Sequence, residues 1–146
     1  MAEASGSEGS EGSDGRGFEL PLLLFAGFRA LLDELHEELA RQGHEEVRPA
    51  YGFALQAVGI GGATASEIGR RLGVSKQAAG KTVDRLEALG YVDRADDPAD
   101  GRRKVVRLTG RGIDVLVRSA AIFEKRSISS GSMDEFVAVI HIAVRR

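Results

Sequence analysis

The feature that most constrains the fold is a pair of short helices joined by one tight glycine-containing turn. The segment TASEIGRRLGVSKQAAGKTVDRLEALG runs from Thr64 to Gly90. In its first helix, Thr64 is the expected N-cap, and Glu67, three residues later, completes a capping box. Gly73 ends this helix, and Ser75 caps the next one almost at once. This arrangement predicts a helix-turn-helix.

The second of these helices has two contrasting faces. Ala79, Val83 and Leu86 recur at helical spacing and predict a narrow buried stripe. The other face carries one amide and two cations spaced four residues apart: Gln77, Lys81 and Arg85. A helix that enters the DNA major groove needs little apolar surface to seat it, and it needs hydrogen-bond donors outside. We therefore predict a recognition helix, in which the amide reads base edges and the cations reach bases or phosphates.

The segment after this helix predicts a β-hairpin. Strands are expected at Tyr91–Arg94 and Lys104–Leu108, and the intervening DDPADGR has Asp, Pro and Gly in turn order. Its tip carries three cations: Arg102, Arg103 and Lys104. A helix-turn-helix followed at once by a basic hairpin is typical of a winged helix. We expect Arg102 to enter the minor groove, where negative potential is concentrated.

Charge supports a polyanionic partner for this part of the chain. Between residues 62 and 112, eleven cations face seven anions, although the whole chain carries a net charge of −2. An N-cap hydroxyl is well placed for a phosphate, and small side chains let the backbone approach the bases. The predicted DNA-binding residues are Thr64, Ser75, Lys76, Gln77, Ala78, Lys81, Arg85, Asp100, Arg102, Arg103 and Lys104.

The stretch TASEIGRRLGVSKQAAGKTVDRLEALGYVDRADDPADGRRKVVRLTGRG resembles the winged helix-turn-helix of the MarR family of bacterial transcriptional regulators. The wing pattern DPADGRRKVVRLT is its most specific part, and the similarity is strong over about Val47–Phe123. The resemblance places the recognition helix at Ser75–Leu89 and the wing at Tyr91–Leu108. It also places the family's wing-tip arginine at Arg102, after Asp100.

The resemblance further implies a homodimer formed by the first, fifth and sixth helices, which binds a pseudo-palindromic operator. Repression by occluding a promoter, and release by a small-molecule effector, are expected on the same ground. A physical argument independent of the resemblance also favours a dimer. One recognition helix reads only a few base pairs, and two copies double the contacts with DNA. Gly101 stands where the family often has a second arginine.

The fold class expected is mostly α: a winged helix-turn-helix with a two-stranded β wing, plus N- and C-terminal helices that form a dimerisation region. Further helices are expected at Glu19–Arg41, with Pro21 in its first turn, and at Arg48–Val58. Another, capped by Thr109, should reach about Arg126. Its expected buried stripe consists of Ile113, Leu116, Val117 and Ala120. A last helix is expected at Met133–Val144.

Composition shifts divide the chain. Residues 1–17 are acidic, Gly/Ser-rich and expected to be disordered. Residues 18–146 form one expected domain, with dimerisation helices at 18–46 and 109–146 and a DNA-binding lobe at 47–108. No signal peptide or membrane span is evident, so we expect a cytoplasmic protein.

Other site classes are weaker. The absence of cysteine excludes disulfides and thiolate chemistry, and no GxSxG, Walker or HExxH motif indicates an enzyme. His36 and His44 have no recognised ligand spacing, so we predict solvated side chains and neither metal nor cofactor. A pocket for a small aromatic effector could be lined by Phe25, Phe28, Tyr51 and Phe53, with core packing as the alternative. An alternative function is a winged helix that contacts protein without specific DNA binding.

Overall fold

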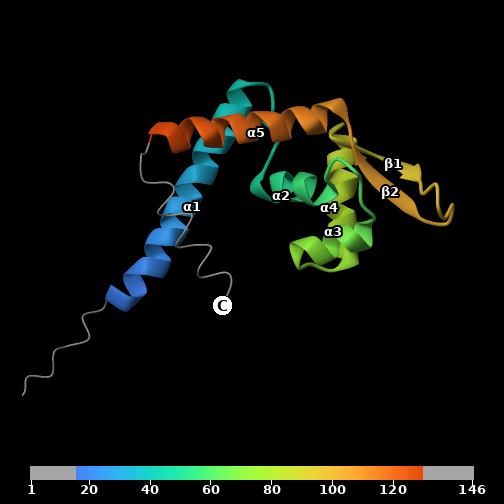
Figure 1. Ribbon diagram of the computed structural model, residues 1–146, viewed down its shortest axis with the longest axis horizontal. Coiled ribbons are helices and arrows are strands. Elements are labelled where there is room, and N and C mark those ends of the chain that lie inside the picture. Colours follow the sequence, from blue (N-terminus) through green and yellow to red (C-terminus); the bar gives the residue numbers. More distant parts are fainter. Residues whose placement is uncertain (1–15, 130–146) are drawn as a thin grey trace, which may run out of the picture. The chain divides into compact units, whose positions relative to one another are not determined.

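The computed structural model describes residues 16–129, and the chain divides into two compact units after Asp33. In order, the elements are α1 (Arg16–Arg41), α2 (Pro49–Val58), α3 (Ala65–Leu72), α4 (Lys76–Ala88), β1 (Val92–Asp96), β2 (Lys104–Leu108) and α5 (Gly110–Ser129) (Figure 1). These elements confirm the mostly α class with a two-stranded wing. The predicted helix Met133–Val144 and most of the predicted tail lie outside the described residues.

Helix α1 begins earlier than predicted. It starts at Arg16, which places Glu19 in its first turn, where a carboxylate is favoured by the helix dipole. Pro21 therefore lies inside the helix, and its predicted place in the first turn is wrong. The end at Arg41 is as predicted. No helix within residues 16–129 is long and apolar enough to cross a membrane.

The core of the second unit lies where α2 packs against α3, α4 and α5. These four helices, the end of α1, the residue before β1 and strand β2 all contribute large side chains with at most 1% exposure: Leu39, Leu55, Val58, Ile68, Val83, Leu86, Tyr91, Val106 and Val115. Helix α3 lies against α4, as a helix-turn-helix requires. The core therefore holds α4 by its apolar stripe and leaves the opposite face exposed.

The wing extends between the end of α4 and the start of α5 (Figure 1). Its antiparallel strands pair Val92 with Leu108 and Asp96 with Lys104. The first strand begins after Tyr91, one residue later than predicted, because the Tyr91 N–H donates to Leu86 O of α4 at 2.9 Å. On its other side β2 forms a bridge between Val106 and a residue just before α3.

The predicted buried stripe of α5 is wrong in phase. Ile113 and Val117 are 44% and 61% exposed, and Ala120 is also exposed. The buried face instead carries Gly112, Val115 and Ser119. A Cβ at position 112 would stand 2.2 Å from the backbone oxygen of Tyr91, so only glycine allows this approach. That contact fixes the rotation of α5 and turns the predicted stripe outward, except for the half-buried Leu116.

Candidate nucleic-acid interface

The turn between α3 and α4 is as tight as the sequence predicts. Gly73 ends α3 in the left-handed conformation, and the Val74 N–H donates to Gly69 O at 2.9 Å. A Cβ at Gly69 would stand 2.9 Å from Val74 O. The turn can therefore pack this closely against α3 only because residue 69 is glycine. Ser75 then caps α4, because its Oγ accepts from the Ala78 N–H at 3.1 Å. The turn thus sets the exit direction of α4.

Helix α4 presents the two faces predicted for it. Ala79, Val83 and Leu86 are fully buried, which confirms the predicted stripe. The predicted contact residues of this helix are all exposed: Lys76, Gln77, Ala78, Lys81 and Arg85. Within residues 16–129, no carboxylate lies at ion-pair distance from the three cations of this face. Their charge is therefore available to a partner.

The acidic residues of α4 are occupied by a single arginine. Arg94 on β1 donates to Asp84 at 2.6 Å and to Glu87 at 3.1 Å. This clamp fastens the wing to α4 and offsets one of the two negative charges that would repel a phosphate. It also explains why a helix with two acids can still present a cationic face.

The wing and the first turns of two helices enclose a basic cleft. This cleft, of about 310 Å³, is lined by Thr64, Ala65, Ser66, Lys76, Arg102, Arg103 and Lys104. The sequence analysis identified the cations of this cleft but missed Ser66. Its position in the first turn of α3, two residues after the N-cap Thr64, could have indicated that it lies at the cleft. The backbone N–H groups of a helix start and nearby guanidiniums both favour an anion. The cleft can therefore hold a phosphate group.

Three predicted contact residues also have structural roles. Thr64 is 9% exposed and forms the predicted capping box, since its Oγ1 accepts from the Glu67 N–H and its N–H donates to the Glu67 carboxylate. These bonds lower the pKa of Glu67, and the backbone bond from Thr64 is the largest cause. Asp100 shapes the wing tip by accepting from the Arg102 N–H at 3.1 Å. Lys104 forms an ion pair with Asp96 across the wing.

The predicted effector residues do not form one site in the second unit. Tyr51 lines a polar groove beside Arg85, whereas Phe53 lines a different groove beside Leu72. Phe25 and Phe28 lie on α1 in the first unit and are 60% and 48% exposed.

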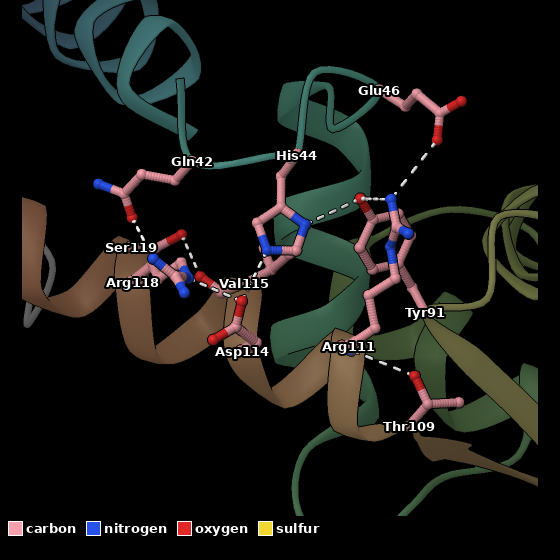
Figure 2. Close-up of polar contacts among 11 residues, drawn as sticks. Gln42, His44, Glu46, Tyr91, Thr109, Arg111, Asp114, Val115, Arg118 and Ser119 are labelled. Atoms are coloured by element: carbon pink, nitrogen blue, oxygen red, sulfur yellow. Dashed lines mark hydrogen bonds and ion pairs between the residues drawn. The ribbon is translucent and has the colours of Figure 1, made fainter. Parts of the chain in front are cut away.

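His44 is not solvated, contrary to the prediction. It is 6% exposed and lies between the hydroxyl of Tyr91 and the carboxylate of Asp114 (Figure 2). Arg118 donates to the same Asp114 oxygen at 2.7 Å. The pKa of Asp114 is lowered, first by the bond from His44 and then by the bond from Arg118. Sequence reasoning missed this network, because a lone histidine in a turn carries no periodic signal.

Comparisons with known proteins agree with this geometry. A sequence model of the MarR family matches residues 47–103, which contain α2, α3, α4, β1 and the wing tip. The uncharacterized HTH-type transcriptional regulator YcgE of Bacillus subtilis (strain 168) is 49% identical over 43 residues. That segment covers 30% of this chain and only 28% of YcgE.

Two solved structures share the fold over most of the chain. The YusO protein of Bacillus subtilis is 26% identical with a TM-score of 0.61, and the match covers 91% of this chain and 95% of YusO. FabT of Streptococcus pneumoniae, solved in complex with DNA, is 20% identical with a TM-score of 0.70, and the match covers 87% and 91%. The sequence model of the MarR family thus matches the winged helix-turn-helix of this chain, and both solved structures share the fold of the chain.

Proposed function

We propose that the protein is a transcriptional regulator that binds double-stranded DNA sequence-specifically, as a homodimer on a pseudo-palindromic operator. The observation that carries the proposal is the exposed cationic face of α4 beside the basic wing cleft. Lys81, Arg85 and Arg102 project from these elements, and no ion pair occupies them within the described part of the chain. A solvated surface helix more often pairs such charges along its own length.

The two elements divide the work of recognition. In the major groove, Gln77 and Lys81 reach base edges, and Ala78 and Gly80 let the backbone come close. At the cleft, Lys76 and the wing cations hold phosphates and fix the register of the helix. FabT, with the same fold, was solved in complex with DNA, which supports this docking.

Dimerisation would use the helices outside the winged-helix lobe. Residues 47–108 form the DNA-binding lobe in this proposal, and residues 18–46 and 109–146 the dimerisation region. The outward apolar side chains of α5, Ile113 and Val117, and those of α1, such as Phe18 and Leu22, support this assignment. Occupation of a promoter by the dimer would repress transcription.

Control by a small aromatic effector is part of the proposal. A ligand releases DNA if it binds better to a conformation whose two recognition helices no longer match the half-site spacing. Tyr51 and Phe53 remain candidate contacts, each in its own groove, together with Phe25 and Phe28.

The test is selection of bound duplexes from a random DNA pool by the purified protein. Enrichment of a palindrome with half-sites about ten base pairs apart supports the proposal. Lys81→Ala should then lose that enrichment. Arg70→Ala, which removes an exposed cation of α3 outside the predicted contact set, serves as the matched control that retains it. No enrichment by the wild type would favour the alternative, a winged helix that contacts protein.

A further inference from the structure

A chain of polar contacts joins three separate segments of the second unit (Figure 2). His44, in the turn after α1, has its Nδ1 3.1 Å from the hydroxyl of Tyr91. Its Nε2 lies 2.8 Å from Oδ2 of Asp114 on α5. The imidazole is 6% exposed and the tyrosine is fully buried, so water does not replace these contacts.

Tyr91 lies at the junction of the recognition helix and the wing. Its N–H donates to Leu86 O, in the last turns of α4, at 2.9 Å. Its carbonyl accepts from the Thr109 N–H, just before α5, at 3.1 Å. A displacement of Tyr91 would therefore move the end of α4 and the base of the wing together.

The hydrogen bonds around Tyr91 indicate which ring nitrogen of His44 accepts and which donates. Arg111 donates to the phenolic oxygen at 3.2 Å, and a guanidinium has no acceptor to offer in return. The phenolic proton must go elsewhere, and the acceptor within reach is Nδ1 of His44. This nitrogen is then unprotonated, and the ring proton sits on Nε2, which donates to Asp114.

The charged side chains around the imidazole form two ion pairs. Asp114 is paired with Arg118, both on α5. Arg111, whose guanidinium lies 4.7 Å from the centre of the Tyr91 ring, faces Glu46 on the segment after His44 at 3.8 Å. With its proton on Nδ1 instead of Nε2, the ring would point a second donor at the phenolic oxygen and offer no donor to Asp114.

We propose that His44 is a positioning residue for DNA binding, which holds Tyr91 and the α4–wing junction in one place against α5. The inference rests on the proposed function. If the dimer forms through α5, the spacing of its two recognition helices depends on this junction. Because His44 is buried and does not contact DNA itself, it affects how well the spacing of the two recognition helices fits two half-sites, and it does not affect binding to a single half-site.

The test compares Tyr91→Phe, which deletes only the hydroxyl, with the wild type on two probes. One is the two-half-site duplex recovered by the selection, and the other is a duplex with a single half-site. We expect Tyr91→Phe to weaken binding to the first about fivefold to a hundredfold, as for the two lost hydrogen bonds with His44 and Arg111, and to leave the second unchanged. Ser119→Ala is the matched control, because within residues 16–129 its buried hydroxyl donates only to Val115 O of the same helix. It should bind both duplexes like the wild type.

The comparison of the two probes is a readout that general destabilisation would not give, because an unfolded fraction lowers the apparent affinity for both duplexes alike. Nitrogen-15 NMR of the imidazole should show the ring proton on Nε2, with Nδ1 as the acceptor of the Tyr91 hydroxyl.

Three results would overturn the inference: equal affinity of Tyr91→Phe and wild type for the two-half-site duplex, equal weakening on both probes, or a ring proton on Nδ1 instead of Nε2. A wild type that binds neither duplex would instead refute the proposed function, and the inference with it.

Discussion

The close approach at the start of α5 makes Gly112→Ala the sharpest test of the structure. The added Cβ would stand 2.2 Å from the backbone oxygen of Tyr91, whereas real Cβ contacts stay above 3.0 Å. Backbone must therefore move by about 0.8 Å, and neither side is a flexible side chain. Overpacking costs about 1–3 kcal/mol. We expect the upper end, because hydrogen bonds to Leu86 and Thr109 hold Tyr91 on both sides.

Gly110→Ala is the matched control for this experiment. It lies in the same turn of α5, but a Cβ there meets nothing within 4 Å. We expect this variant to gain about 0.4–1 kcal/mol from the lower entropy of its unfolded chain. The assay is urea and thermal unfolding followed by circular dichroism, in which Gly112→Ala should melt roughly 6–12 °C below the wild type. Equal stability of Gly112→Ala and the wild type would show that α5 does not lie against Tyr91.

Three further predictions concern a cap, a charge and a pH dependence. Thr64→Ala should lower the free energy of unfolding in urea by about 1 kcal/mol, because it removes half of the capping box; an unchanged midpoint would contradict the box. Arg102→Ala should reduce the salt slope of DNA affinity by about one unit, and an unchanged slope would exclude a phosphate contact. Asp114→Asn should destabilise the fold at neutral pH, since the folded pKa of Asp114 lies below its ordinary value of 3.8. The ionised Asp114 carboxylate stabilises the fold fully above its unfolded pKa, and this stabilisation is lost as pH falls through the lower folded pKa. The gap between variant and wild type should therefore close in acid, and a constant gap would contradict the ion pair.

Local signals made the winged helix predictable from sequence. The capping box at Thr64 and the buried stripe of Ala79, Val83 and Leu86 depend on neighbours within a few turns, and the structure has both. The hairpin could be predicted from the Asp, Pro and Gly residues of its turn alone. The sequence could therefore predict which residues of α4 and the wing are exposed at the candidate site. Their contacts with DNA remain predictions.

The sequence could not show which face of α5 is buried or that His44 is buried, because tertiary contacts decide both. Two stripes are possible on α5, one through Ile113 and Val117 and one through Val115 and Ser119, and both have helical spacing. Only the approach of Gly112 to the wing junction selects the second. His44 meets partners 47 and 70 residues away along the chain, so no local pattern indicates its burial.

The bridge between Ala63 and Val106 has a consequence for insertions and deletions. The two residues exchange both backbone hydrogen bonds, at 3.0 and 2.8 Å, and Val106 is 1% exposed. An extra residue within β2 would turn this valine outward and pull on the start of α3. A change of length at the exposed tip around Gly101 meets no such obstacle. The reach of the wing can therefore vary while its base stays fixed.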